Sequence, residues 1–267
     1  MSHLLSLQQK CHQNEKLALL TCYDASFASR LETAGIDAIL VGDSLGMVFQ
    51  GQPTTLPVSL SDMAYHTAAV ARATRSTLII ADLPFGSYQT SPGQAFDAAA
   101  RLMASGAHCV KLEGGELMAE TVHFLTSRGI PVCGHLGLLP QSVFTSGGYG
   151  IQAKTSAAAE RLIEDALLLE QAGASMVVLE AIPAALARQT TERLGIPTIG
   201  IGAGNECDGQ VLVLYDMLGI TPGKTPRFVR NFMEDATSIQ QAIERYIAAV
   251  KDGSFPAHEH SYLKPVA

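Results

Sequence analysis

Ionisable side chains stand at the ends of several short apolar segments of this chain. Each lies within the last residues of such a segment or directly after it: Asp43, Asp82, Lys111, Glu113, His135 and Glu180. Elsewhere charge is scarce, because Asp, Glu, Lys and Arg make up only 16% of the 267 residues, against about 25% in an average soluble protein. Ionisable groups at matching positions indicate a binding or catalytic site.

Three of these side chains, Asp43, Asp82 and Glu113, predict a metal site. Carboxylates packed together without a cation would repel one another and take up protons. Oxygen ligands favour Mg²⁺, which binds one or two carboxylates together with water and substrate oxygens. The alternative is that each acid is a turn residue or a helix cap. That role does not require matching positions at the ends of successive segments.

The other three side chains could act on a substrate. Lys111 is two residues before Glu113 and therefore points to the same side of a strand. It could pair with a substrate carboxylate, form a Schiff base, or make a structural ion pair with Asp82 or Glu113. Glu180, expected away from the metal and with a pKa raised by burial, is a candidate base or else a salt-bridge partner. His135 could donate to a substrate oxygen, although a lone histidine is more often structural.

A repeated unit positions these residues. Five times, a helix-like segment ends at a glycine that precedes a short apolar run: Gly35, Gly106, Gly129, Gly173 and Gly195. Each glycine fits the left-handed position that ends a helix, and each run fits a strand covered on both faces. Further candidate strands without the glycine are Leu17–Cys22, Thr77–Asp82 and Val211–Tyr215.

Eight strands that alternate with helices predict an α/β fold with a parallel sheet. The chain length favours a closed (β/α)₈ TIM barrel over an open doubly wound sheet. The expected helices are Leu60–Arg72, Gly93–Ala104, Ala157–Gln171, Ala184–Arg193 and Ala236–Val250. We expect one barrel domain over residues 1–267, with a short N-terminal extension and a polar, irregular tail after Gly253. In such barrels the active site forms at the C-terminal ends of the strands, where the six ionisable side chains are expected.

Composition argues against several classes of partner and site. The net charge of −7 and the lack of a Lys/Arg cluster argue against nucleic acid and anionic membranes. No apolar run has the length of a membrane helix, and no signal-peptide pattern is seen, so a cytoplasmic protein is expected. The five scattered cysteines argue against a disulfide framework or a zinc site, and Cys22, Cys109 and Cys133 are expected to be buried. The scarce charge also suggests subunit interfaces.

A magnesium–carboxylate centre with a lysine and a separate base suits a 2-oxo acid. The carboxylate and keto oxygen of such an acid can chelate the ion, which then stabilises an enolate. These residues alone do not choose among aldolases, lyases and mutases. The glycine-rich segment from Gly200 to Asn205 fits either a phosphate site, as in many barrels, or a tight turn approached by another element.

The sequence resembles the ketopantoate hydroxymethyltransferase family through essentially its whole length. The motifs that carry the resemblance are TCYD at 21–24, VGDSLGM at 41–47, TLPV at 55–58, YH at 65–66, ADLPFGSY at 81–88, VKLEGG at 110–115, PVCGHLGL at 131–138, GGY at 147–149, LE at 179–180, IGIGAG at 199–204, FP at 255–256 and EHSY at 259–262. So many long motifs in one order are highly specific.

The resemblance implies a barrel similar to those of phosphoenolpyruvate mutase and isocitrate lyase, and assembly as a decamer. It implies transfer of a hydroxymethyl group from 5,10-methylenetetrahydrofolate to 3-methyl-2-oxobutanoate, the first step of pantothenate synthesis. Mg²⁺ is expected at Asp43, Asp82 and Glu113, the last either directly or through a water. The residues expected to hold the 2-oxo acid are Asp43, Ser44, Asp82, Lys111 and His135. Glu180 matches the base that takes the proton from C3.

Three positions depart from the family pattern. Leu139 stands where Thr is common, Gly150 where Lys is common, and Tyr215 where His is common. None is a strand-end residue, so the departures put the affinity for folate in question, through a lid at Gly150, and leave the expected chemistry as it is. Two other interpretations are a C–C lyase of the same superfamily, whose Lys-Cys-Gly-His segment is only partly matched by Val132–His135, and a non-catalytic, phosphate-binding barrel.

Overall fold

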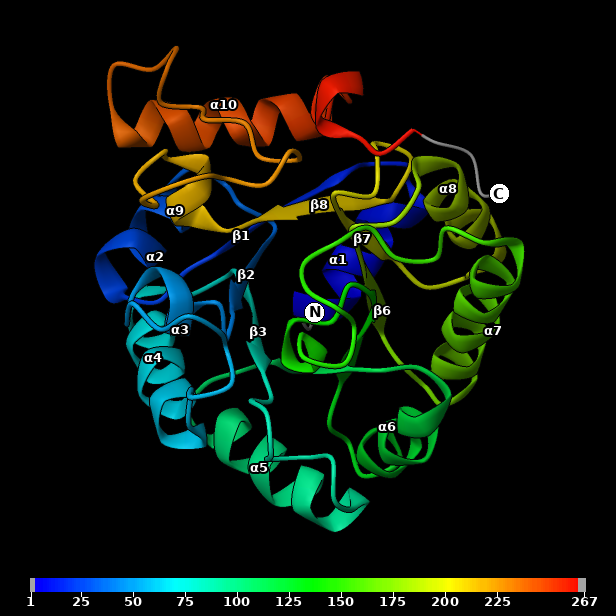
Figure 1. Cartoon of the computed structure of the whole chain (residues 1–267). Helices are drawn as coiled ribbons and strands as arrows, with labels where there is room; N and C mark the ends of the chain where they lie inside the picture. The colour runs from blue at the N-terminus through cyan, green and yellow to red at the C-terminus, as the bar shows by residue number, and fades with distance from the viewer. Residues whose placement is uncertain (1–2, 264–267) are drawn as a thin grey trace.

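A closed barrel of eight parallel strands forms the centre of the computed structural model, which describes residues 3–263 (Figure 1). The strands follow one another around the barrel in chain order, and β8 pairs with β1. Their bounds are β1 (Leu17–Thr21), β2 (Ala38–Val41), β3 (Leu78–Asp82), β4 (Cys109–Glu113), β5 (Val132–Gly137), β6 (Met176–Glu180), β7 (Thr198–Ile201) and β8 (Gly209–Leu212). This topology confirms the predicted (β/α)₈ barrel and excludes the open sheet.

Helices surround the barrel, as Figure 1 shows. The α-helices are α1 (His3–His12), α2 (Ala25–Thr33), α3 (Leu45–Val48), α4 (Leu60–Ala73), α5 (Pro92–Ala104), α6 (Ala119–Thr126), α7 (Ser156–Gln171), α8 (Ala184–Arg193), α9 (Leu214–Met217) and α10 (Ile239–Lys251). Three short 3₁₀ turns are η1 (Glu116–Met118), η2 (Pro140–Ser142) and η3 (His258–His260). The long helices at α4, α5, α7 and α8 agree with the prediction to within one residue at each end.

Burial and capping explain why these segments take these conformations. Every residue of β1 to β4 is buried, as expected for strands covered by helices outside and by side chains inside. Helices α4, α5 and α7 each begin after a hydroxyl residue, Ser59, Ser91 or Thr155, whose side-chain oxygen accepts a backbone N–H of the first turn. Such caps satisfy donors that the helix itself leaves free.

Helix α1 lies at the end of the barrel where the strands begin. Leu7 is buried, and the Gln8 side chain donates to the carbonyl oxygen of Ser175, just before β6. The ring of His3 packs against His108, just before β4. The N-terminal segment therefore covers the end opposite the predicted site.

Four of the five repeated glycines adopt positive φ angles, from +82° at Gly35 to +108° at Gly106. Gly173 also needs to be small, since a Cβ there would lie 2.8 Å from Oγ1 of Thr126. The prediction is wrong for Gly195, which is not among the left-handed glycines. There α8 ends at Arg193 and Leu194 is already extended, so no left-handed turn is needed.

Two predicted boundaries are wrong. The eighth strand is Gly209–Leu212 rather than Val211–Tyr215, because Gly209 pairs with β7 and with β1, and residues from Leu214 onward turn into α9. The last helix begins at Ile239 rather than Ala236, since the Ser238 side chain accepts the backbone N–H of Gln241 and caps the helix there.

The tail after Gly253 packs on the barrel rather than extending from it. It contains η3, and the carbonyl oxygen of Tyr262 accepts the backbone N–H of Ala184 at the start of α8. Residues 264–267 of the predicted tail lie outside the described residues. Within residues 3–263, each helix is too short or too polar to cross a bilayer.

Candidate active site

The carboxyl ends of β2, β3 and β4 bring three acids together. Asp43 follows β2 by two residues, Asp82 ends β3 and Glu113 ends β4. All three are buried, with 3%, 2% and 6% of their surface exposed. The backbone N–H of Asp43 donates to Oδ2 of Asp82 at 3.0 Å, so the two aspartates are in direct contact. The predicted clustering of these acids is therefore found in the structure.

This cluster carries more negative charge than its surroundings neutralise. Burial raises the pKa of Asp43 well above its usual value, and the nearby carboxylates of Asp82 and Glu113 raise it further. Oδ1 of Asp82 and Oε1 of Glu113 are buried and accept no hydrogen bond, although each lies within ion-pair distance of a basic side chain, Lys111 and His135 respectively. Buried polar atoms normally find partners, so these oxygens suit a bound cation.

The acid cluster suits an ion that takes only some of its ligands from the protein and the rest from water and substrate oxygens. Among residues 3–263, no group of three or more His, Cys, Asp or Glu side chains is arranged to hold a metal ion by itself. Mg²⁺ usually takes only one or two carboxylates and fills its remaining positions with water and substrate. The acids present thus match Mg²⁺ better than a metal that needs a closed protein site.

Lys111 supplies the positive charge inside the cluster. Its Nζ lies 3.1 Å from Oδ1 of Asp82, and only 5% of the side chain is exposed. Burial alone would lower its pKa, but Asp82, Glu113 and Asp43 outweigh that effect and raise it. The lysine is therefore held as a cation. This favours the ion-pair and carboxylate-binding roles over a Schiff base, which needs the neutral amine.

His135 lies between two acids on neighbouring strands. Its Nδ1 is 3.5 Å from Oε1 of Glu113, and its Nε2 is 3.2 Å from Oε2 of Glu180. Burial and the charge of Lys111 lower its pKa, but the contacts with the two glutamates prevail and raise it to about 8. Glu180 is thus one side chain away from the acid cluster, and it keeps 15% exposure toward the barrel mouth.

Ser44 belongs to a hydroxyl chain at the mouth. Its Oγ lies 2.9 Å from the hydroxyl of Tyr23, which lies 2.9 Å from Oγ1 of Thr21. Oγ1 of Thr21 in turn accepts the backbone N–H of Leu214, at the start of α9. The serine is half-buried beside Asp43, so all seven predicted site residues lie at one end of the barrel.

Two residues of the site were missed from the sequence, Gln141 and Tyr88. The Gln141 side chain donates to Oδ2 of Asp43, and the Tyr88 hydroxyl accepts the backbone N–H of Glu113. Both lie in loops beyond strand ends, where no periodicity marks a side chain as inward-facing. Tyr88 belongs to the family motif at 81–88, whereas Gln141 lies outside the motifs that carried the resemblance.

The glycine-rich segment from Gly200 to Asn205 is explained by close packing. A Cβ on Gly202 would lie 2.6 Å from the ring of Phe228, and one on Gly204 would lie 2.6 Å from Cβ of Ala184. Both glycines also have positive φ angles. Of the two interpretations, the structure supports the tight turn approached by other elements.

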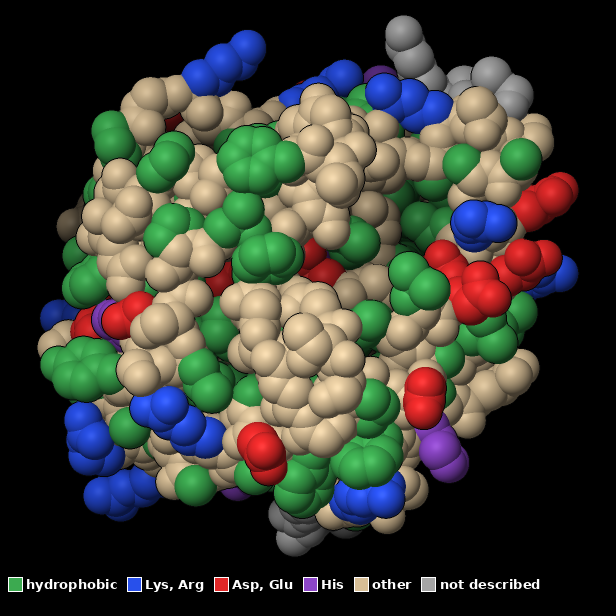
Figure 2. All heavy atoms as spheres, turned by 60° about the horizontal axis from the view of Figure 1, so that its bottom comes forward, with side chains coloured by type: hydrophobic (Ala, Val, Ile, Leu, Met, Phe, Trp, Pro, Cys, Tyr) green, Lys and Arg blue, Asp and Glu red, His purple; other side chains and the backbone are tan. Residues whose placement is uncertain are grey.

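The loop between β5 and α7 covers part of the mouth. The backbone N–H of Gln152 donates to the carbonyl of Ala181, and the Tyr149 hydroxyl lies 3.7 Å from Sδ of Met47. In Figure 2, acidic atoms are recessed near the centre of the view, among hydrophobic and uncharged side chains. Of the three departures from the family pattern, Leu139 and Gly150 lie in this loop and Tyr215 lies on α9 against the ring of Tyr23. None of them replaces a charged site residue.

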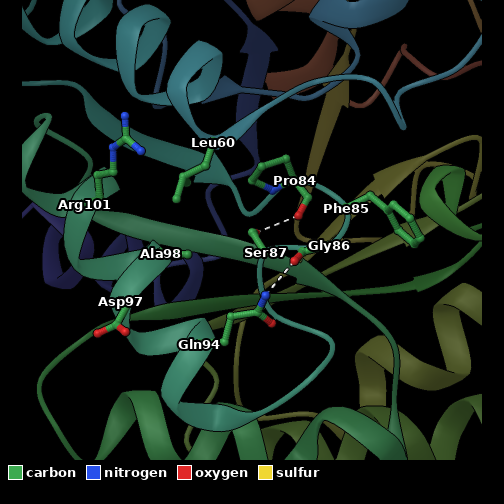
Figure 3. Close-up of a pocket in the computed structure, with 9 residues that line it drawn as sticks. All are labelled: Leu60, Pro84, Phe85, Gly86, Ser87, Gln94, Asp97, Ala98 and Arg101. Carbon is green, nitrogen blue, oxygen red and sulfur yellow. Dashed lines mark hydrogen bonds between the residues drawn. The ribbon is translucent and has the colours of Figure 1, made fainter.

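A groove lies beside the mouth, between α4, α5 and the loop after β3 (Figure 3). It has a volume of about 510 Å³ and includes Pro84, Phe85 and Arg101. Its Ser87 and Gln94 side chains donate to backbone carbonyls of the same loop. None of the seven predicted site residues lines it. It is therefore separate from the acid cluster.

The burial of the cysteines agrees with the sequence analysis. All five are free thiols, and Cys22, Cys109 and Cys133 are fully buried. Burial raises the pKa of Cys22 and of Cys133 to about 12. These thiols are thus inert packing residues rather than nucleophiles.

The chain is similar to known proteins over nearly its whole length. Residues 2–258 match the family described as ketopantoate hydroxymethyltransferase. The 3-methyl-2-oxobutanoate hydroxymethyltransferase of Nitrosomonas eutropha is 61% identical over 97% of this chain and 96% of the relative. The enzyme of that name from Paraburkholderia phytofirmans is 60% identical over 96% of this chain and 94% of the relative.

Solved structures show the same fold at low sequence identity. Phosphonopyruvate hydrolase, in a complex with oxalate and Mg²⁺, superposes with a TM-score of 0.62 at 14% identity, over 99% of this chain and 100% of that one. A 2,3-dimethylmalate lyase of the phosphoenolpyruvate mutase and isocitrate lyase superfamily superposes with a TM-score of 0.59 at 19% identity, over 82% and 83%. These likenesses establish the barrel type.

Proposed function

The chain belongs to the ketopantoate hydroxymethyltransferase family and is an enzyme of that kind, and we propose the chemistry by which it acts. A hydroxymethyl group passes from 5,10-methylenetetrahydrofolate to 3-methyl-2-oxobutanoate and gives 2-dehydropantoate. The observation that carries this proposal is the cluster of Asp43, Asp82 and Glu113 beside Lys111, with Glu180 one histidine away.

Asp43 and Asp82 would hold Mg²⁺, with Glu113 bound directly or through a water. The support is that buried oxygens of Asp82 and Glu113 accept no hydrogen bond, and that the pKa of Asp43, raised by its burial, is raised further by the neighbouring carboxylates. When bound, the ion would supply a Lewis acid for the keto oxygen, which favours enolisation of the 2-oxo acid.

The protein's own groups bind and orient the 2-oxo acid. Lys111 would neutralise part of the charge of the substrate carboxylate, because it stays protonated within the cluster. Ser44 and His135 would direct hydrogen bonds at substrate oxygens from opposite sides of the acids. Their positions are fixed by Tyr23 on one side and by Glu113 on the other.

Glu180 would act as the base. It would take the proton from C3 of the 2-oxo acid, and the resulting carbanion equivalent would attack the methylene carbon of the folate. One C–N bond of the methylene bridge breaks as the folate opens for attack and the C–C bond forms. The second C–N bond breaks as water supplies the hydroxyl oxygen, and tetrahydrofolate leaves with a proton on each of the two nitrogens. The partial exposure of Glu180 at the mouth supports this role, since a base must reach a bound substrate.

We also propose the setting in which this enzyme works. Its partners would be the 2-oxo acid, the folate and further copies of the same chain in a homodecamer, with neither nucleic acid nor membrane involved. The reaction would be the first step of pantothenate biosynthesis, on the route to coenzyme A, in the cytoplasm. The support is the family membership together with the sparse charge of the chain.

Proton exchange at C3 tests the chemistry without the folate. The C3 proton of 3-methyl-2-oxobutanoate would be followed by NMR in D₂O, with Mg²⁺, with EDTA, and with Glu180→Gln plus Mg²⁺. We expect exchange with Mg²⁺, its loss in EDTA, and a fall of about 100-fold or more in the variant, as for loss of a general base.

Matched samples separate the possible outcomes. Glu160→Gln, an exposed position on α7, should exchange at the wild-type rate. If the wild-type enzyme shows no exchange of the C3 proton, the measurement is repeated with tetrahydrofolate to complete the site. If no exchange is seen even with tetrahydrofolate, or if exchange continues in EDTA, the proposed chemistry is contradicted.

A further inference from the structure

Gln141 is a buried side chain that contacts the acid cluster and has no role in the function proposed above. It lies in η2, the turn after β5, and is 5% exposed. Its Nε2 donates to Oδ2 of Asp43 and to the carbonyl oxygen of Leu83, both at 2.9 Å. Its Oε1 accepts from the Tyr88 hydroxyl at 2.8 Å and from Nε2 of Gln89 at 3.1 Å. These four bonds use the full hydrogen-bonding capacity of a carboxamide.

The surroundings fix which way this amide points. The carbonyl of Leu83 can only accept, so the group that faces it must be the NH₂. On the other side, the Tyr88 hydroxyl accepts the backbone N–H of Glu113 at 3.1 Å, which leaves its own proton for Oε1 of Gln141. Both neighbours therefore require that an N–H of Gln141 points at Asp43.

The backbone of Gln141 holds a second acid. Its N–H donates to Oε2 of Glu113 at 3.0 Å. The other oxygen of Glu113, Oε1, accepts no hydrogen bond and lies 3.5 Å from Nδ1 of His135. One residue thus engages one oxygen of a carboxylate that follows β2 and one oxygen of a carboxylate at the end of β4.

We propose that Gln141 is a positioning residue that prepares Asp43 and Glu113 to bind a divalent cation together with the 2-oxo acid. This inference rests on the proposed function of the acid cluster. A carboxylate held through one oxygen cannot rotate freely, and it presents its second oxygen in a fixed direction. Groups that hydrogen-bond to metal ligands orient those ligands toward the ion.

The competing explanation is that Gln141 only fills space and supports its loop. That explanation predicts that an apolar side chain of similar length changes stability and leaves cation affinity as it was. The positioning role predicts weaker cation binding in a folded protein, together with recovery of the exchange reaction at high Mg²⁺.

Gln141→Met tests the two explanations, with Gln210→Met as the control. Gln210 is also buried, but its Nε2 donates to the carbonyl of Gly204, away from the acids. Binding of Mn²⁺, as a spectroscopic substitute for Mg²⁺, is titrated by electron paramagnetic resonance with 3-methyl-2-oxobutanoate present. Thermal melting in EDTA reports whether each variant is folded.

We expect Gln141→Met to weaken Mn²⁺ binding by about 10–100-fold, as is typical for groups that orient metal ligands. C3 exchange should fall at low Mg²⁺ and recover largely at saturating Mg²⁺. Gln210→Met should bind Mn²⁺ as the wild type does. A folded Gln141→Met with wild-type Mn²⁺ affinity would overturn the proposal, and so would a loss of exchange that high Mg²⁺ does not restore.

Tyr88→Phe keeps the proposal testable if Gln141→Met does not fold. It retains the buried ring and removes the hydroxyl, which donates to Oε1 of Gln141 and accepts the backbone N–H of Glu113. We expect a smaller but measurable loss of Mn²⁺ affinity, and an unchanged affinity would count against the positioning role. If the wild-type protein itself shows neither Mn²⁺ binding nor C3 exchange, the proposed function fails instead.

Discussion

Lys111 balances the charge of three buried acids, so its removal should lower the stability of the protein even without substrate. Its Nζ contacts Asp82, and its pKa is raised by the carboxylates around it. Removing one partner of a buried ion pair leaves an uncompensated charge and commonly costs about 3–5 kcal/mol. We therefore expect Lys111→Met to lower the melting temperature in EDTA, and Mg²⁺ to restore part of the loss.

Differential scanning calorimetry with and without Mg²⁺ measures both effects. Lys154→Met, at an exposed position before α7, serves as the control and should melt as the wild type does in either buffer. A Lys111→Met protein that melts at the wild-type temperature in EDTA would show that the acids are not ionised together. The Lys111–Asp82 ion pair would then contribute little to the stability of the protein.

The residues that sequence could place are those whose position follows from strand periodicity. Lys111 and Glu113 lie two residues apart on β4 and therefore share one face of the strand, the face that contacts Asp82 and His135. Gln141 could not be placed in this way. Its bonds reach Asp43 and Leu83, which are 98 and 58 residues away in the chain. Such contacts form when the loops after β3 and β5 fold over the end of the barrel, and no local sequence pattern predicts them.

Glu32 joins α2 to the segment that enters β3, and its charge should stabilise that junction. Its Oε1 accepts the backbone N–H groups of Arg75, Ser76 and Thr77. Although burial acts to raise it, these bonds lower the pKa of Glu32 from 4.5 to about 2. Glu32→Gln should reduce the free energy of unfolding at pH 7 by about 1 kcal/mol, similar to the loss of a helix cap.

The sign of the pH dependence follows from the lowered pKa. The stabilisation is complete above the unfolded pKa near 4.5 and is lost as the pH falls toward the folded pKa near 2. The difference in melting temperature between wild type and Glu32→Gln should therefore be constant near neutrality and shrink below pH 4.5. Glu164→Gln, exposed on α7, should show no such difference. If the difference in melting temperature between wild type and Glu32→Gln grows as the pH falls, this account is contradicted.

The barrel itself was predictable because each strand is locally distinct, being short, apolar and bounded by turns. The start of the last helix depends on a local cap at Ser238, whereas the limits of β8 depend on other strands. β8 begins at Gly209, where Asp208 accepts the backbone N–H of Thr198 and fixes the register against β7. The short helix after it starts where Leu214 donates to Thr21, on the first strand. Barrel closure sets these limits, and closure is a property of the whole sheet.

The surface of the whole molecule combines few charges with exposed apolar side chains. Leu117 is 87% exposed and Phe144 80% exposed, and Tyr65 is 70% exposed on α4. Hydrophobic side chains also appear among mostly uncharged ones in Figure 2. Large apolar side chains left in water favour association, because burying them releases about 25 cal/mol for each Å².

Light scattering and sedimentation equilibrium test the proposed decamer directly. We expect a single species with ten times the mass of the 28.2 kDa chain at micromolar concentration. Raising NaCl to 1 M shortens the Debye length to about 3 Å and should leave that mass unchanged, since apolar contacts are not weakened by salt. Dissociation in high salt would instead point to interfaces held by ion pairs. A 28.2 kDa species at all concentrations would mean that the exposed side chains do not mediate self-association, and that C3 exchange, if seen, is the work of a single barrel.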